Sequence, residues 1–389
     1  MIPYGKHYID EDDIQSVVDV LRSGSLTQGS TVDAFEQAIA QYVGAKYAVA
    51  VSSGTSALHL TAIAAGVKPG NFIVTSPITF VATANAARYC GGDVLFADID
   101  PDTINMSPAA LKELLSKNLN VRAIIPVHFA GLPCDMVSIK NLADSVGAVV
   151  IEDAAHALGA TYPNGKRVGC CENSLMTIFS FHPVKAIAAG EGGMITTNDE
   201  LVYRHLLRLR SHGINKLDDP LVLSNQAFSE GMKNPWYYEM QELGFHYRIT
   251  DIQCGLGLSQ LGKLDKFIAK RRDLAQRYDA TFQNMHNCNP IHSESRSVSG
   301  MHLYVLRINF DKISYNRAEL MKALKLKGVG TQVHYLPVTA HPYYQNINIH
   351  ASHPAATDYY NQALSIPLFY DLGNDDQDIV ISAFKELVG

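Results

Sequence analysis

Residues 149–156 read Val-Val-Ile-Glu-Asp-Ala-Ala-His, an apolar run that ends in two carboxylates. Short, continuously apolar runs are typical of strands that are buried on both faces of a parallel sheet. Open α/β sheets bind their ligands at the carboxyl ends of such strands. Asp153 is therefore expected where a carboxylate can hold a protonated heterocyclic nitrogen, and His156 can point into the same site. The alternatives are that Asp153 caps the next helix and that His156 is structural.

Similar apolar runs lie on both sides of this stretch. The expected strands are Ala48–Val51, Phe72–Thr75, Val94–Ala97, Ala123–Val127, Ala148–Ile151 and Leu175–Phe179. Helix-compatible segments such as Thr83–Tyr89 and Met136–Val146 lie between most of these runs. The alternation of strands and helices predicts an α/β layered domain with a mainly parallel sheet.

Two helical patterns precede the first of these runs. The apolar spacing over residues 14–21 follows an acidic turn and predicts a helix that ends at Gly24. The same spacing over residues 35–42 predicts a second helix, with Ser30 or Thr31 as its cap.

The chain changes character after the last run. Residues 213–240 are polar and irregular, and they contain the only tryptophan, Trp236. Loops of this length are uncommon in compact domains unless they carry function. We expect a large domain at residues 1–248 and a small α+β domain at residues 249–389. The elements expected in the small domain are helices over 250–282 and 317–326 and a strand over 303–308.

The segment Ser52-Ser53-Gly54-Thr55-Ser56-Ala57-Leu58 joins the first apolar run to a helical pattern. A strand that turns through small residues into a helix presents free backbone N–H groups and hydroxyls. Gly54, Thr55 and Ser56 can thus cradle a phosphate, and a simple helix cap explains the same residues equally well.

Lys185 lies between an apolar strand pattern and the glycine-rich turn at residues 190–193. Poor solvation at such a place lowers the pKa of an amine and makes it a nucleophile toward aldehydes. The alternative is a solvated surface lysine. Together, the phosphate cradle, Asp153 and Lys185 follow one another at the ends of neighbouring strands. Pyridoxal phosphate requires this set, namely a phosphate anchor, a partner for the ring nitrogen and a Schiff-base lysine.

The composition excludes several classes of protein. The 389 residues are 47% hydrophobic and 18% charged, which indicates a globular chain with more than one domain. The net charge of −6 comes without a basic stripe, so nucleic-acid binding is not expected. We find neither a secretory signal nor a membrane span, and the six cysteines form no Cys-x-x-Cys pair, so a cytoplasmic protein with reduced thiols is expected. The 15 histidines lack the spacing of a metal hydrolase, and no metal is expected.

Several ordered blocks carry a resemblance to one protein family. They are Leu26-Thr27-Gln28-Gly29, Ser53-Gly54-Thr55-Ser56-Ala57-Leu58, Glu152-Asp153-Ala154-Ala155-His156, Ser180-Phe181-His182 with Lys185, Gly190-Glu191-Gly192-Gly193, Tyr247-Arg248-Ile249-Thr250-Asp251-Ile252-Gln253 and Val333-His334-Tyr335. On these blocks the chain resembles the DegT/DnrJ/EryC1/StrS nucleotide-sugar aminotransferases. The resemblance implies the fold-type I architecture, with a mainly parallel, seven-stranded sheet between helices and a smaller α+β C-terminal domain.

The resemblance also implies roles around pyridoxal 5′-phosphate. Lys185 would bind the cofactor as a Schiff base and move the proton between sugar and cofactor. Asp153 would pair with the ring nitrogen, and His156 would lie beside the ring hydroxyl. Phe80 matches the aromatic residue that stacks on the ring, with core packing as the alternative. The implied phosphate ligands are Gly54, Thr55, Ser56 and Ser180.

Further positions match places where relatives contact the nucleotide sugar or the cofactor of a neighbouring subunit. The implied sugar contacts are Tyr4, Gly24, Ser25, Leu26, Thr27, Gln332, Val333, His334 and Tyr335. His246 stands where relatives commonly have an asparagine that the neighbouring subunit lends to the cofactor phosphate. A histidine can also donate to a phosphate, or it can point away.

Within the family, the blocks at residues 26–29, 180–185 and 332–335 most resemble the branch that serves pseudaminic acid biosynthesis. This resemblance implies amination of a UDP-linked 4-keto-6-deoxy sugar by L-glutamate, through pyridoxamine 5′-phosphate, in a homodimer with shared active sites. The bacillosamine, perosamine and aminoarabinose routes keep the chemistry and change the sugar. A sugar dehydratase would have histidine in place of Lys185, and a non-catalytic relative would have lost Lys185 or Asp153.

Overall fold

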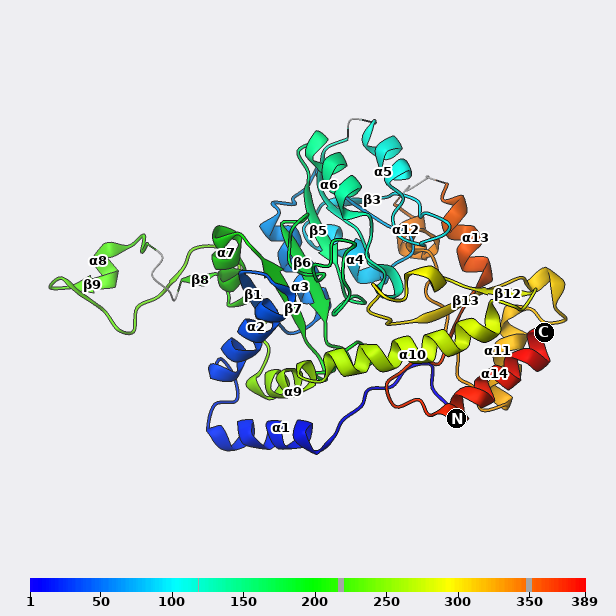
Figure 1. Cartoon of the computed structure of the whole chain (residues 1–389). Helices are drawn as coiled ribbons and strands as arrows, with labels where there is room; N and C mark the ends of the chain where they lie inside the picture. Colours follow the sequence, from blue (N-terminus) through cyan, green and yellow to red (C-terminus); the bar gives the residue numbers. More distant parts are fainter. Residues whose placement is uncertain (118, 216–219, 348–351) are drawn as a thin grey trace.

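A seven-stranded sheet forms the centre of the molecule, with helices on both of its faces (Figure 1). The computed structural model describes residues 1–117, 119–215, 220–347 and 352–389. The strand order is β1-β7-β6-β5-β4-β2-β3, and β7 runs antiparallel to its neighbours β1 and β6 while the other adjacent pairs are parallel. The strands are β1 (Tyr47–Val51), β2 (Phe72–Thr75), β3 (Asp93–Phe96), β4 (Val121–Ile125), β5 (Val149–Asp153), β6 (Met176–Ser180) and β7 (Gly193–Thr197).

The predicted α/β fold and the mainly parallel sheet are confirmed. Each of the six expected runs is a strand, β1 to β6, with bounds that differ by at most two residues. The apolar pattern of the sequence does not predict β7, in which two threonines take strand positions. Thr196 and Thr197 are buried because each hydroxyl donates 2.8 Å to a carbonyl oxygen, those of Gly169 and Leu175 respectively.

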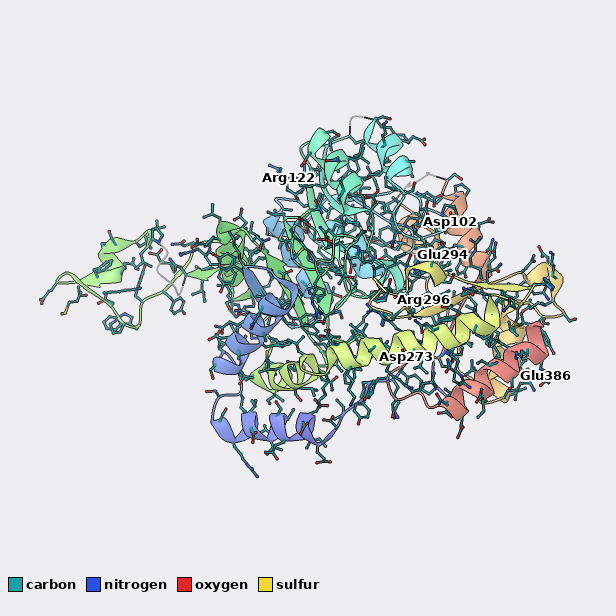
Figure 2. All side chains as sticks on the ribbon, viewed as in Figure 1. Asp102, Arg122, Asp273, Glu294, Arg296 and Glu386 are labelled. Atoms are coloured by element: carbon teal, nitrogen blue, oxygen red, sulfur yellow. The ribbon has the colours of Figure 1, made fainter. Side chains whose placement is uncertain are left out.

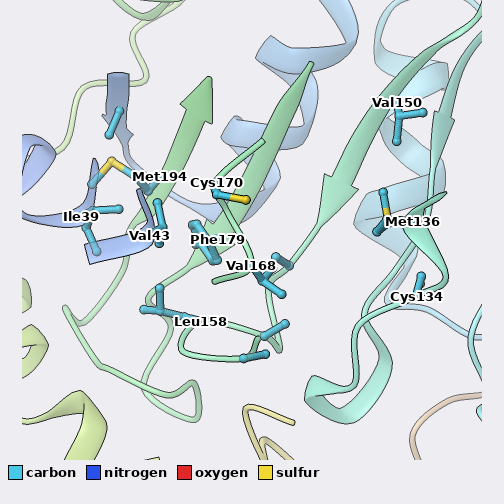
Figure 3. Packing of buried hydrophobic residues seen from close by; sticks show 14 of the residues in the cluster. Ile39, Val43, Cys134, Met136, Val150, Leu158, Val168, Cys170, Phe179 and Met194 are labelled. Atoms are coloured by element: carbon cyan, nitrogen blue, oxygen red, sulfur yellow. The ribbon is translucent and has the colours of Figure 1, made fainter. Parts of the chain in front are cut away.

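The helices pack on the sheet as two layers, which gives a three-layer sandwich. One face carries α3 (Gly54–Ala64), α4 (Val81–Tyr89) and α7 (Glu200–Arg210). The other face carries α2 (Ser30–Val43), α5 (Pro108–Leu115), α6 (Met136–Ser145) and α9 (Asp251–Leu261). In the second layer, Phe179 and Met194 of the sheet share one buried cluster with Ile39 of α2 (Figure 3).

The start of α2 corrects the predicted cap. The cap position is Gly29 rather than Ser30 or Thr31, and its side-chain partner comes from elsewhere in the chain. Asp251 at the start of α9 accepts hydrogen bonds from the N–H groups of Gly29 at 2.9 Å and Thr31 at 3.2 Å. The carboxylate of Asp251, which is distant in sequence, therefore caps the N-terminus of α2 in place of the predicted local hydroxyl.

A smaller layered unit follows the large sheet along the long helix α10 (Leu264–Phe282) (Figure 1). Its antiparallel sheet has the order β12-β13-β14. Arg296, which is labelled in Figure 2, makes a buried, bidentate contact of 2.9 and 3.0 Å with Asp279 of α10. The strands of the smaller unit are β12 (Cys288–Pro290), β13 (Tyr304–Ile308) and β14 (Ala363–Ile366), and its helices besides α10 are α11 (Arg317–Leu326), α13 (Pro354–Gln362) and α14 (Asn374–Val388). The short helix α12 (Pro342–Gln345) packs on the large sheet instead, in the cluster that contains α4.

The boundary at residues 248/249 stays a prediction. Ile249 and Cys254 pack into the cluster beside the large sheet, whereas Leu274 and Tyr278 of α10 pack into the cluster of the smaller unit. The expected helix over 250–282 is divided into α9 and α10. The N-terminal helix α1 (Glu11–Ser23) lies beside α9 (Figure 1).

The irregular segment forms an arm that projects away from the body (Figure 1). We use "the arm" for its described residues, 213–215 and 220–240; the prediction for 216–219 lies outside the described residues. Several large apolar side chains in the arm are exposed, with Trp236 at 72%. The elements of the arm are β8 (Ile214–Asn215), α8 (Ser224–Ala227), β9 (Phe228–Ser229), β10 (Met232–Lys233) and β11 (Glu239–Met240).

Candidate active site

One cavity collects most of the predicted site residues at the carboxyl ends of the central strands. Its volume is about 390 Å³. It lies where β5 and β6 end and α3 begins, the place at which open α/β sheets bind ligands. The predicted residues that line it are Tyr4, Gly54, Thr55, Phe80, Asp153, His156, Ser180, Lys185, His334 and Tyr335.

The start of α3 forms one wall and fits a phosphate. Ser53 is the cap residue, and its hydroxyl accepts a hydrogen bond of 3.0 Å from the Ser56 N–H. A Cβ at Gly54 would come within 3.0 Å of the Ser180 Cβ, so glycine lets β6 approach the helix start closely. The first N–H groups of a helix have no partner within the helix, and Gly54 and Thr55 line the cavity. The cap and the phosphate cradle thus coexist.

Asp153 is the buried last residue of β5 and faces the cavity. Its Oδ2 accepts a hydrogen bond of 2.7 Å from Thr83 Oγ1, and its Oδ1 accepts one of 3.1 Å from the Ala155 N–H. Burial raises the pKa of Asp153, and the hydrogen bonds and the nearby charge of Lys185 oppose this rise. A protonated ring nitrogen would supply a further compensating charge.

Lys185 lies in the turn that follows β6, where its N–H donates to the His182 carbonyl at 2.8 Å. The side chain keeps partial exposure to solvent. Desolvation lowers the pKa of Lys185 to about 8, although the negative charge of Asp153 favours the protonated amine. Near neutral pH a usable fraction of the amine is therefore unprotonated, as a Schiff-base lysine requires.

His156 contributes a polar atom that suits a ligand oxygen. Its Nε2 lies 3.2 Å from the Tyr335 hydroxyl, and its ring centroid lies 4.3 Å from that of His302. Its buried Nδ1 has no hydrogen-bond partner among the described residues. Burial and the neighbouring charge of Lys185 hold the pKa of His156 well below its usual value, so the ring is neutral. A neutral imidazole with a free nitrogen fits the place beside a ring hydroxyl.

Phe80 stands at the cap position of α4, on the edge of the cavity. Its side chain is 59% exposed, which disfavours the alternative that it packs in the core. Its ring centroid lies 6.4 Å from that of Tyr335. Its stacking on the cofactor stays a prediction.

Some predicted residues do not line this cavity. The Ser56 hydroxyl lies 3.0 Å from Ser52 Oγ and 2.9 Å from Ser53 Oγ, inside the cap. Gln332 is tied by backbone hydrogen bonds to Ser365, and the ring of His246 lies 5.3 Å from that of His212 at the base of the arm. The predicted residues outside the cavity of their own chain are Gly24, Ser25, Leu26, Thr27, Ser56, His246, Gln332 and Val333.

Two residues that contribute to the site were not predicted from the sequence. Thr83 holds Asp153, and its place one turn after Phe80 on a helical pattern could have indicated it. His302 lines the cavity from the segment before β13, and no local signal marks it.

The helices in the described part of the chain lack the length and apolar character that a bilayer span requires.

Comparison with known proteins identifies the family. The sequence profile of the DegT/DnrJ/EryC1/StrS aminotransferase family matches residues 7–385. The chain belongs to this family. It is a nucleotide-sugar aminotransferase that depends on pyridoxal phosphate and acts on a nucleotide-linked keto sugar with an amino donor.

Relatives of this aminotransferase match along its whole length. The spore coat polysaccharide biosynthesis protein SpsC of Bacillus subtilis is 40% identical over 392 residues, which cover 100% of this chain and 97% of that protein. The UDP-4-amino-4,6-dideoxy-N-acetyl-β-L-altrosamine transaminase of Campylobacter jejuni is 37% identical over 381 residues, 98% of this chain and 96% of that protein.

Solved structures agree with the fold. Helicobacter pylori PseC, an aminotransferase involved in pseudaminic acid biosynthesis, has a TM-score of 0.89 at 30% identity and covers 100% and 99% of the two chains. The PLP form of a sugar aminotransferase from Streptococcus pneumoniae has a TM-score of 0.87 at 27% identity, over 99% and 98% of the two chains.

Proposed function

We propose that this aminotransferase moves the amino group of L-glutamate to C4 of a UDP-linked 4-keto-6-deoxy-N-acetylhexosamine. The product would be UDP-4-amino-4,6-dideoxy-N-acetyl-β-L-altrosamine, in pseudaminic acid biosynthesis. The observation that supports the aminotransferase chemistry is that Lys185, Asp153 and the start of α3 line one and the same cavity. The choice of sugar is supported by the C. jejuni transaminase at 37% identity and by the likeness to H. pylori PseC.

In this proposal, each residue of the cavity has a separate role in binding the cofactor or in transferring a proton. Lys185 would hold the cofactor covalently, and its Nζ would carry a proton while the amino group is transferred. Asp153 would hold the ring nitrogen, while Gly54, Thr55 and Ser180 would hold the phosphate. When bound, pyridoxal phosphate supplies the electron sink that allows an amino group and a carbonyl to be exchanged.

The proposed enzyme is a homodimer with shared active sites. In support, Gly24–Thr27 and His246 match family positions that contact sugar or cofactor, yet they do not line the cavity of their own chain. The exposed apolar side chains of the arm also need a cover, since such patches mark interaction sites. A second copy of the chain would bring Gly24–Thr27 and His246 to a cavity and would cover the apolar side chains of the arm.

A second candidate keeps the chemistry and changes the sugar. The B. subtilis relative, at 40% identity, serves spore coat polysaccharide synthesis by its name and leaves the sugar open. The bacillosamine, perosamine and aminoarabinose routes therefore remain the competing substrates.

A coupled assay separates the candidates. The enzyme is given L-glutamate and either of two UDP-linked 4-keto-6-deoxy-N-acetyl sugars, the L-arabino and the D-xylo epimer, and the release of 2-oxoglutarate is followed. Preference for the L-arabino epimer supports the pseudaminic acid assignment. Preference for the D-xylo epimer moves the enzyme to the bacillosamine route. The Lys185→Ala variant is the blank, and turnover in that variant would contradict the role of Lys185.

A further inference from the structure

Glu152 is a buried carboxylate that the proposed chemistry does not use. It is fully buried, one residue before Asp153 on β5. Successive side chains of a strand point to opposite faces. Asp153 therefore faces the cavity, while Glu152 points into the opposite layer, where Val150 of the same strand belongs to the buried cluster (Figure 3).

Four side chains donate to the Glu152 carboxylate. Oε1 accepts from Ser174 Oγ at 2.5 Å and from Thr177 Oγ1 at 3.0 Å. Oε2 accepts from the Tyr162 hydroxyl and from His128 Nε2 at 2.8 Å. Burial alone would raise the pKa of Glu152, and these hydrogen bonds outweigh it, so the pKa lies below its usual value. Glu152 is an ionised, fully bonded group inside an apolar layer.

The partners of Glu152 come from the segments on both sides of β5. Thr177 belongs to β6, and Ser174 lies just before that strand. His128 follows β4 and is itself fixed, because the Cys134 N–H donates to its Nδ1 at 3.1 Å. That contact leaves the ring proton on Nε2, where it faces Glu152. The carboxylate thus ties β5 to both neighbouring strands.

The same segments hold the backbone of Asp153. The His128 N–H donates to the Asp153 carbonyl at 3.1 Å, and the Asp153 N–H donates to the Pro126 carbonyl at 2.9 Å. His128 therefore contacts Glu152 through its ring and Asp153 through its backbone. A shift of His128 would move the end of β5 from which the Asp153 carboxylate projects.

Stability alone is a weak reason for this arrangement. A buried charge costs free energy even when it is well bonded, and apolar side chains of similar size often replace such groups without loss. Ordered polar networks do, however, fix the orientation of the groups beside them. We propose that Glu152, through His128, is a positioning residue that sets the Asp153 carboxylate against the cofactor ring nitrogen.

This inference rests on the proposed role of Asp153, and the experiment tests both. Dissociation constants are measured on the full-length apoenzyme for pyridoxal phosphate and for its analogue with carbon in place of the ring nitrogen. The constant of the analogue divided by that of pyridoxal phosphate gives the preference for pyridoxal phosphate, and this ratio reports the contact between the carboxylate and the nitrogen. A merely structural change weakens both ligands alike and leaves the ratio unchanged.

The variants are Asp153→Asn, Glu152→Gln and, as a control, Asp279→Asn. The control carboxylate is also buried, but it is bonded to Arg296 and Tyr304 in the smaller unit. We expect the preference for pyridoxal phosphate to fall most in Asp153→Asn, about tenfold in Glu152→Gln and not at all in Asp279→Asn. If Glu152→Gln does not fold, Tyr162→Phe removes one donor and is expected to lower the ratio by a smaller factor.

Two results would overturn the inference in distinguishable ways. An unchanged ratio in Asp153→Asn removes the role of Asp153, and with it any role of Glu152. A reduced ratio in Asp153→Asn together with unchanged ratios in Glu152→Gln and Tyr162→Phe leaves Asp153 in place and removes the positioning role alone.

Discussion

Thr83 donates a hydrogen bond of 2.7 Å from Oγ1 to Oδ2 of Asp153, which links the first turn of α4 to the end of β5. The Thr83 hydroxyl also lies 2.8 Å from that of Thr79. The other Asp153 oxygen accepts from the Ala155 N–H. The carboxylate is therefore held on both oxygens before any ligand binds, and the hydrogen bond from Thr83 favours its ionised form.

Thr83→Val should weaken cofactor binding. The change keeps the shape of the side chain and removes the donor, and a hydrogen bond to a charged group contributes about 1.5–3 kcal/mol. We expect the dissociation constant of pyridoxal phosphate to rise about tenfold or more, measured by fluorescence titration of the apoenzyme. Thr83→Ser keeps the hydroxyl and is the control. Equal constants for Thr83→Val and the parent enzyme would show that Asp153 does not depend on Thr83.

The fold could be predicted where local pattern and burial coincide. The run before Asp153 became β5 because its residues are apolar without interruption and both sheet faces are covered. Strand β7 was missed because Thr196 and Thr197 become compatible with burial only through carbonyl groups some 20 residues away or more. The cap of α2 was assigned wrongly because its acceptor, Asp251, is distant in sequence.

The site residues could be predicted where they directly follow a strand, and not where distant segments bring them to the cavity. Lys185 and Asp153 follow strands directly, so their place at the sheet edge follows from the chain order. His302 reaches the cavity only because β13 packs against the large unit, and nothing in its neighbourhood indicates this. His246 lies outside the cavity, and one chain by itself does not bring it there.

Lys185 should make the apoprotein less stable near neutral pH. Desolvation lowers the pKa of Lys185 from 10.5 to about 8 in the native state. Between these pH values the unfolded chain binds more protons than the native chain, so stability rises with pH. Below pH 8 both states are protonated, and the poorly solvated charge has its full cost. Lys185→Met should therefore stabilise the apoprotein at pH 7 by about 1–3 kcal/mol.

Urea unfolding of the apoprotein at a series of pH values measures this effect. The gain from Lys185→Met should shrink as the pH rises from 8 towards 10.5. Lys112→Met, at an exposed position of α5, is the control and should change stability little. A gain that is the same at every pH would mean that packing, rather than the charge of Lys185, is responsible.

His246→Ala should reduce retention of the cofactor. In the proposed dimer His246 donates to the cofactor phosphate of the other subunit, and hydrogen bonds to ionised groups are the strong ones. We expect the dissociation constant of pyridoxal phosphate to rise roughly tenfold, because such a bond contributes about 1.5–3 kcal/mol. His286→Ala changes an exposed histidine of the smaller unit and is the control. Identical constants would place His246 away from the phosphate.

The arm should hold the dimer together. Met232 and Trp236 are 71% and 72% exposed in the single chain, and a short two-stranded hairpin is marginal by itself in water. Changing both residues to serine should raise the dimer dissociation constant roughly tenfold or more, since buried aromatic anchors dominate interfaces. Sedimentation velocity over a dilution series measures this constant. Leu326→Ser is the control, because Leu326 is also highly exposed, at 82%, but lies on α11, outside the arm. If the double variant dissociates no more readily than the control, the arm is not the contact, and the cover of its apolar side chains has to be sought in another partner.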